Sequence, residues 1–110
     1  RQRKMFIRIR IDRSINYLEK TLTIKPDYTE VHNNLGIILM DLGQLDHAIK
    51  HYDKSISIKA DYASAHLNLS YLKKYTASDP QIAKMQSLLS SDNVTQSGRI
   101  ELCFALAKVN

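Results

Sequence analysis

The sequence predicts an all-α protein in which antiparallel helix hairpins stack in tandem. Residues 17–36 align with residues 51–70 at an offset of 34, and eight of the twenty aligned pairs are identical. A fixed period of this length is typical of stacked supersecondary units. Apolar residues in each copy recur at helical spacing, and one hairpin cannot bury its apolar faces without a neighbour. With 110 residues, 44% of them hydrophobic, the chain is long enough for one domain.

The best-defined hairpin runs from Asp27 to the turn at residues 59–61. Asp27 is placed to cap its first helix and Glu30 to complete a capping box, after a proline that ends the preceding helix. Gly43 is expected to end this helix. The apolar positions are Val31, Leu35, Ile38, Leu39 and Leu42 in the first helix and Leu45, Ala48, Ile49, Tyr52 and Ile56 in the second. A short loop between two such helices makes them antiparallel.

The unit resembles the tetratricopeptide repeat (TPR), a 34-residue helix-turn-helix. The matching residues are Leu35, Gly36, Leu39, Gly43, Asp46, Ala48, Ile49, Tyr52, Ile58, Asp61 and Tyr62. Small residues at Gly36 and Ala48 allow two helices to approach closely. Departures are Ser70 at the place of Gly36, Thr21 and Ser55 at a usual alanine, and Ala60 at the place of Pro26. The resemblance implies TPR-like repeats in a short right-handed superhelix.

The predicted organisation is a single helical domain, 1–110. It comprises a partial repeat (1–28), a full repeat (29–62), the first helix of a third repeat (63–75) and a divergent helical pair (79–110) cut from a longer chain. Near the N-terminus, Ile9 stands where Gly43 supplies a turn, so one helix is expected from about Lys4 to Ile24. An alternating strand through Ile7 and Ile9 is the alternative, but Ile7, Ile11, Ile15, Leu18 and Leu22 form a helical stripe. A homodimer through this stripe is a further hypothesis.

The C-terminal part has two helix start signals. Asp79 and Pro80 begin one helix, and Thr95 or Asp92 can cap the next. The last helix is strongly apolar: Ile100, Leu102, Cys103, Phe104, Leu106 and Val109. Asp79 to Ile82, Met85, Leu88, Leu89, Arg99 and residues 104–108 resemble, with loose motifs, the segment after the repeats in bacterial TPR proteins fused to a sulfotransferase domain.

Composition limits the possible partners and compartment. The net charge of +5 arises from Arg1, Arg3, Lys4, Arg8, Arg10 and Arg13 against Asp12, and the other residues carry ten basic and ten acidic groups. A charge confined to one end is usually a solvated end, so no nucleic-acid partner is predicted. No apolar run is long enough for a membrane span. The single cysteine, Cys103, is predicted to be buried and to suit a reducing compartment, the cytoplasm.

The sequence offers no catalytic constellation, so a non-enzymatic protein without a cofactor is predicted. The three glycines are isolated, which excludes a Gly-rich phosphate loop. His47 and His51 have the spacing of metal ligands, but they lack a third His or Cys ligand and are interpreted as a surface pair. His32 and His66 are related by the repeat and are interpreted as packing residues. Core filling also explains the repeated tyrosines better than base stacking.

The TPR resemblance places the first helix of each hairpin along a concave groove. The predicted partner-binding residues are Glu30, Asn33, Asn34, Ile37, Met40, Asp41, Ser64, Leu67, Asn68, Tyr71, Lys74 and Tyr75. Asn34 and Asn68 lie one repeat apart, as in the asparagine ladder of the repeats attached to the O-linked N-acetylglucosamine transferase. Such amides can bind the backbone of an extended peptide, or they can tie neighbouring helices together. Asn33 and Leu67 replace the basic residues that bind chaperone tails in the family.

The predicted function is a protein-interaction scaffold. The alternative is a regulatory or substrate-positioning portion of a larger sulfotransferase or glycosyltransferase.

Overall fold

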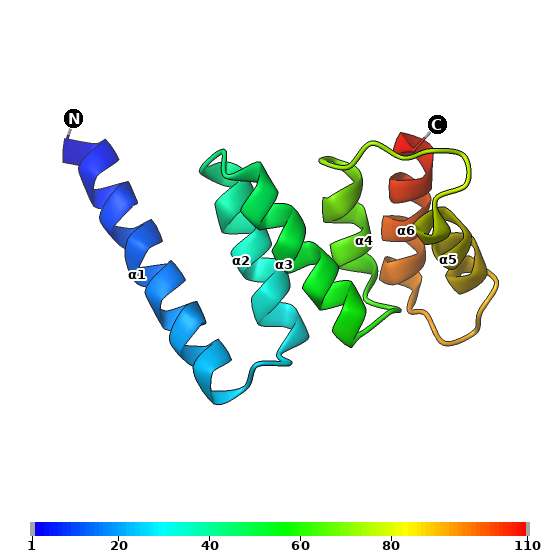
Figure 1. Ribbon diagram of the computed structural model, residues 1–110, viewed down its shortest axis with the longest axis horizontal. Coiled ribbons are helices and arrows are strands. Elements are labelled where there is room, and N and C mark those ends of the chain that lie inside the picture. Colours follow the sequence, from blue (N-terminus) through cyan, green and yellow to red (C-terminus); the bar gives the residue numbers. More distant parts are fainter. Residues whose placement is uncertain (1, 110) are drawn as a thin grey trace.

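Residues 2–109 are described by the computed structural model, and over this range the chain forms six α-helices that pack in pairs. They are α1 (Gln2–Ile24), α2 (Thr29–Asp41), α3 (Leu45–Ile58), α4 (Ala63–Ser70), α5 (Pro80–Leu89) and α6 (Gln96–Lys108). In a molecule of 47 × 30 × 24 Å, α1 to α4 follow one another, and α6 lies between α4 and α5 (Figure 1). The predicted all-α fold is confirmed.

The first four helices alternate in direction. In Figure 1, α1 and α3 run downward, α2, α4 and α6 run upward, and α5 lies obliquely to them. The upward helices begin at Thr29, Ala63 and Gln96, 34 and 33 residues apart. The spacing of these helix starts therefore persists as far as α6, although the sequence similarity fades after Tyr75 and α5 packs mainly against α6. The packing is less regular than the period, because α4 packs mainly against α6 and α3.

Two boundaries differ from those predicted. The capping box is wrong: α2 has Tyr28 as its N-cap residue, without a side-chain capping bond, because the helix begins one residue later than Asp27 would cap. α4 ends at Ser70 and does not reach Tyr75. Lys73 lies beyond the helix, where its ammonium is 3.0 Å from the Asp79 carboxylate. The expected end of α2 is confirmed, since Gly43 has a φ of +79°, which favours glycine.

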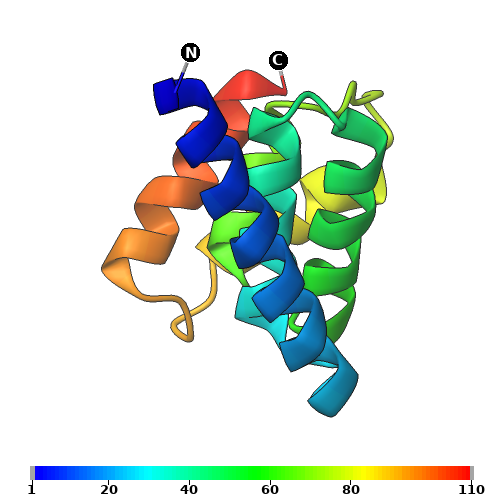
Figure 2. The ribbon, with the colours of Figure 1, turned by 90° about the vertical axis from the view of Figure 1, so that its left-hand side faces the viewer.

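The single N-terminal helix predicted from Ile9 is confirmed, and it runs obliquely across the hairpin of α2 and α3 (Figure 2). Its stripe is only partly covered. Ile11, Ile15, Leu18 and Leu22 are half-buried, whereas Ile7 is 51% exposed. The first turns expose further apolar side chains: Met5, Phe6 and Ile9. α1 therefore carries an unusual amount of exposed apolar surface.

Two apolar clusters hold the array together. Leu39, Ala48, Tyr52 and Leu69 join α2, α3 and α4, and Ala63, Met85, Leu88, Leu102 and Ala105 join α4, α5 and α6. The predicted close approach at Gly36 is confirmed, because a Cβ there would lie 2.4 Å from Cε1 of Tyr52. A buried Ser55 adds a hydrogen bond from its hydroxyl to the Thr29 carbonyl at 3.1 Å. The serine thus replaces the usual alanine without leaving its hydroxyl unpaired.

The C-terminal helix starts are as predicted. Asp79 caps α5 by accepting from the Gln81 amide at 2.9 Å, and Thr95 caps α6 by accepting from the Gly98 amide at 3.0 Å. The prediction that Cys103 is buried is wrong, since its side chain is exposed. Phe104 is also 59% exposed. α6 buries only the face of Leu102 and Ala105, so the neighbouring apolar positions remain on the open side. No helix among the described residues is both long and apolar enough to span a membrane.

Candidate protein-interaction site

The predicted partner-binding residues of α2 divide between two sides of the helix. Asn33 is buried, and Met40 is half-buried against the α2–α3–α4 cluster. Glu30, Asn34 and Asp41 are exposed. Since these three are spaced four and seven residues apart, they share one helical face, which is the face available to a partner.

Asn33 and Asn68 contact each other across two helices. The Asn68 side-chain amide donates to Oδ1 of Asn33 at 3.0 Å, which connects α4 to α2. The asparagines were expected either to bind a peptide backbone or to connect neighbouring helices. For Asn68 this bond favours the connection between helices. Asn34 is different, because its side chain is exposed and makes no hydrogen bond to another described residue. Its amide is therefore free to bind another molecule.

The predicted residues of the third repeat lie partly outside a helix. Ser64 and Leu67 are in α4, Tyr71 is its C-cap residue, and Lys74 and Tyr75 lie in the following linker. Leu67 and Tyr75 pack against the α4–α5–α6 cluster. The Lys108 ammonium is 4.3 Å from the centroid of the Tyr71 ring. Lys74 is exposed, so it and Tyr71 remain accessible at this end of the row.

An apolar cavity lies between α1 and α2. Its volume is about 460 Å³, and its lining residues are Ser14, Tyr17, Leu18, Asn34, Ile37 and Ile38. Two of these, Asn34 and Ile37, are predicted partner-binding residues. The α1 residues and Ile38 were missed, because sequence periodicity gives the faces of helices and not the oblique angle at which α1 packs.

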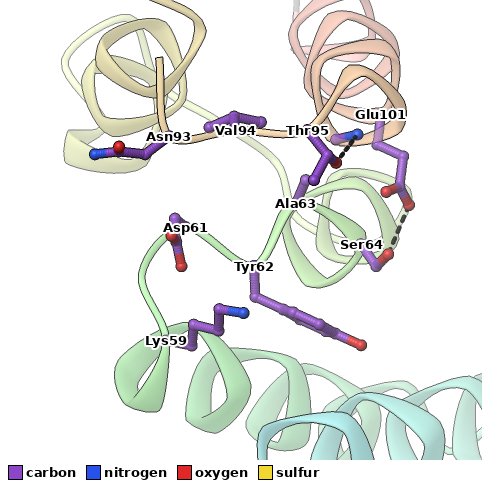
Figure 3. Close-up of a pocket in the computed structure, with 10 residues that line it drawn as sticks. Lys59, Asp61, Tyr62, Ala63, Ser64, Asn93, Val94, Thr95 and Glu101 are labelled. Atoms are coloured by element: carbon purple, nitrogen blue, oxygen red, sulfur yellow. Dashed lines mark hydrogen bonds between the residues drawn. The ribbon is translucent and has the colours of Figure 1, made fainter. Parts of the chain in front are cut away.

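A smaller polar pocket of about 220 Å³ lies where α4 and α6 begin (Figure 3). Lys59, Asp61 and Tyr62 line it from the turn between α3 and α4. Ser64 donates to the Glu101 carboxylate at 2.7 Å at the edge of the pocket, which joins the start of α4 to the middle of α6. The Ser64 hydroxyl is therefore engaged within the fold and is not positioned as a free donor.

Two buried histidines perform the same structural task in successive repeats. Nε2 of His32 lies 2.9 Å from the Pro26 carbonyl, and Nε2 of His66 lies 2.8 Å from the Ala60 carbonyl, six residues earlier in both cases. A carbonyl only accepts, so each Nε2 donates and joins a helix to the preceding turn. The predicted packing role of this pair is confirmed.

The other ring nitrogen of each histidine, Nδ1, lies within hydrogen-bond distance of a side chain on the next helix. Nδ1 of His66 accepts from the side-chain amide of Gln81 at 3.1 Å, whereas Nδ1 of His32 lies 3.1 Å from Nδ1 of His51. His51 is thus not a plain surface residue as predicted. Burial lowers its pKa, and the nearby His32 lowers it further. The described residues contain no group of three His, Cys, Asp or Glu side chains that could hold a metal ion.

Comparison with protein families identifies one unit of this fold. The profile of the TPR repeat matches residues 36–74, which comprise the second half of α2, all of α3 and α4, and part of the linker. The chain therefore contains a TPR repeat, a class of unit that indicates protein–protein interaction in general. Comparison with curated proteins gives no match.

Proposed function

We propose that the chain is a non-enzymatic interaction module that binds an extended segment of a protein partner along the face of α2 and α4. The TPR repeat at residues 36–74 supports a protein partner. The observation that carries the proposal is the position of Asn34, whose exposed amide lies at an apolar cavity without a partner in the described fold. Such an amide can donate to and accept from a peptide backbone without reading its sequence.

The predicted residues contribute in two ways. Asn33 and Asn68 fix the spacing of α2 and α4 through their hydrogen bond. The exposed members contact the partner together with Ile37, which is half-buried and lines the cavity: Glu30, Asn34, Asp41, Tyr71 and Lys74. In this proposal the exposed stripe on α2 is the centre of the binding face, and the residues after α4 lie at its edge.

The proposal is tested with peptides selected on the protein from an unbiased displayed library. Asn34→Ala should weaken their binding several-fold in calorimetric titration and leave the fold intact, since a lost hydrogen bond is worth roughly 0.5–1.5 kcal/mol. Asn68→Ala is the matched comparison, and it should lower the unfolding midpoint because it leaves Asn33 unpaired. Equal affinity of the wild type and Asn34→Ala would remove Asn34 from the site, and failure to select any peptide would refute the proposed function.

A second proposal is that the chain forms the regulatory or substrate-positioning portion of a larger sulfotransferase or glycosyltransferase. Its support is the loose resemblance of residues 79–108 to a post-repeat segment. The start of α6 one period after the start of α4 favours a continued repeat array instead. The scaffold is therefore the preferred function.

Self-association through the N-terminal helix is also proposed. Its support is the apolar surface that the first turns of α1 leave exposed, with Met5 at 64% and Ile9 at 42%. An exposed apolar patch of this kind is typical of an interaction site. For the compartment, we propose the cytoplasm, where the exposed thiol of Cys103 stays reduced.

A further inference from the structure

The cavity between α1 and α2 has the composition of a side-chain binding pocket. Leu18, Ile37 and Ile38 give it apolar walls, and Ser14 and Asn34 supply polar groups. It is a depression wide open to solvent, and its volume of about 460 Å³ accommodates a leucine or phenylalanine side chain lying on the surface. Apolar walls with a few polar groups are the usual pattern of a ligand site.

The α1 side of this cavity continues as an exposed strip that has an aromatic residue at each end. Phe6, Arg10 and Ser14 are four residues apart, so they lie on one face of the helix. Phe6 is 63% exposed and Tyr17, on the same side, is 68% exposed. A segment that filled the cavity and lay along α1 would cover both aromatic rings.

The same part of α1 carries an excess of positive charge, with Asp12 as its one acidic residue between Lys4 and Arg13. Lys4, Arg8, Arg10 and Arg13 are exposed, and the one ion pair of the described fold joins Lys73 and Asp79 at the far side. Arg10 lies one turn before Ser14, and Arg13 lies one turn before Tyr17. Two guanidinium groups thus stand on the helix beside the cavity, where they favour a partner with carboxylates.

We propose that the α1–α2 cavity binds an apolar anchor side chain of an acidic protein segment, whose carboxylates pair with Arg10 and Arg13. The inference rests on the proposed function and narrows the class of partner. A nucleic acid would pair with the arginines but would leave the apolar cavity empty. An acidic segment with an apolar anchor satisfies both features when its carboxylates lie on the α1 side, because Glu30 and Asp41 share the exposed face of Asn34 on α2. Asn34 then binds its backbone beside the anchor.

The experiment uses three short fluorescent peptides and a single-stranded oligonucleotide. The first peptide has a central leucine between glutamates, the second has alanine in place of the leucine, and the third has lysines in place of the glutamates. The first should bind at least about tenfold tighter than the other two, which corresponds to roughly 1.4 kcal/mol. Its affinity should fall as salt is added, because exposed charge pairs are screened.

Two charge-reversal variants separate the proposed site from a general charge effect. Arg10→Glu with Arg13→Glu should weaken the first peptide at least about tenfold. Lys50→Glu with Lys54→Glu is the matched control, since it makes the same change in charge at exposed positions of α3. This control should leave the affinity within about twofold of the wild type. Ser14→Leu, which fills the cavity, should remove the preference for leucine over alanine in the peptide. Circular dichroism checks that each variant keeps its helix content.

Several results would overturn the inference. They are equal binding of the leucine and alanine peptides, equal losses in the two charge-reversal pairs, and tighter binding of the oligonucleotide than of the first peptide. Concentration-dependent shifts of the Tyr17 and Ile38 amide resonances without peptide would show that a second copy fills the cavity, which also contradicts it. If library-selected peptides bind along α2 and α4 without needing Arg10 and Arg13, this inference fails and the proposed function stands.

Discussion

At the scale of single residues, Gly36 determines how closely α2 and α3 can approach. Tyr52 is fully buried against it, and a Cβ at Gly36 would lie 2.4 Å from Cε1 of the ring. On an open helix, Gly→Ala would stabilise by up to about 1 kcal/mol. Here the ring has no room to move, so Gly36→Ala should lower the free energy of unfolding by about 1–3 kcal/mol. Urea titration followed by circular dichroism measures the change.

Ser70 provides the comparison, because it occupies the place of Gly36 in the next repeat and already has a Cβ. Among the described residues, its hydroxyl donates to the nearby Leu67 carbonyl alone. Ser70→Ala should therefore change the free energy of unfolding by no more than about 1 kcal/mol. A Gly36→Ala variant as stable as the wild type would show that the hairpin can open to admit the methyl group.

His66 should make the stability depend on pH. Burial is the main cause that lowers its pKa from 6.5 in the folded chain. Above pH 6.5 the ring is neutral in both states. As the pH falls below 6.5, the unfolded chain binds the proton first, so stability is lost toward the lower pKa of the folded state. Protonation of Nδ1 would also break its hydrogen bond with the side-chain amide of Gln81. The urea midpoint should thus decrease between about pH 7 and pH 5.

His66→Gln tests this assignment. The variant cannot take up a proton at this position, so its midpoint should decrease less over the same range. Part of the slope should remain, because burial also lowers the pKa of His51. Identical slopes for the wild type and His66→Gln would contradict a contribution from His66.

At the scale of helices, the start of α5 depends on one carboxylate. Asp79 accepts from the Gln81 amide and pairs with the Lys73 ammonium, and the hydrogen bond from the Gln81 amide is the main cause that lowers its pKa. Asp79→Ala should cost about 1 kcal/mol of stability, as the loss of an N-cap does. Amide hydrogen exchange should accelerate in the first turn of α5.

Asp92→Ala is the matched control for this helix start. Asp92 is exposed in the loop between α5 and α6, where Thr95 supplies the cap of α6. The change in charge is the same, but no helix start is lost, so the free energy of unfolding should stay within about 0.5 kcal/mol of the wild type. Equal losses in the two variants would indicate a general charge effect and not a cap.

The helices themselves were predictable, and their ends less so. Gly43 and Pro80 punctuate the chain through backbone geometry, and this information is local. The end of α4 depends instead on contacts with distant residues. Lys73 pairs with Asp79 at the start of α5, and Tyr75 packs against the α4–α5–α6 cluster. Cys103 was misplaced for a related reason: α6 is apolar on several sides, and only its packing against α4 and α5 selects the buried side.

At the scale of the whole molecule, the candidate site was only partly predictable. The repeat indicated that α2 presents Asn34 and Ile37 to a partner, and both line the cavity. It also suggested equal roles for Asn34 and Asn68. In the structure Asn68 of α4 donates to Asn33 of α2, whereas Asn34 makes no such bond to a described residue. Tyr17 lines the cavity because α1 packs obliquely against α2. The angle between these helices depends on contacts between segments that are distant in the sequence.

The packing of α1 also leads to the final prediction, which concerns self-association. The stripe first considered for a dimer is half-buried at Ile11 and Ile15, so those residues pack within the chain. Met5 and Ile9, one turn apart, stay exposed on another side of α1. Buried apolar surface contributes roughly 25 cal/mol per Å², so pairing of two such helices can stabilise a weak dimer.

Sedimentation equilibrium should show the apparent mass rising with concentration for the wild type. Met5→Glu with Ile9→Glu should remain monomeric, whereas Lys50→Glu with Lys54→Glu should associate like the wild type. A wild type that is monomeric at every concentration would refute the dimer, and association of the Met5→Glu, Ile9→Glu variant would place the contact on another face.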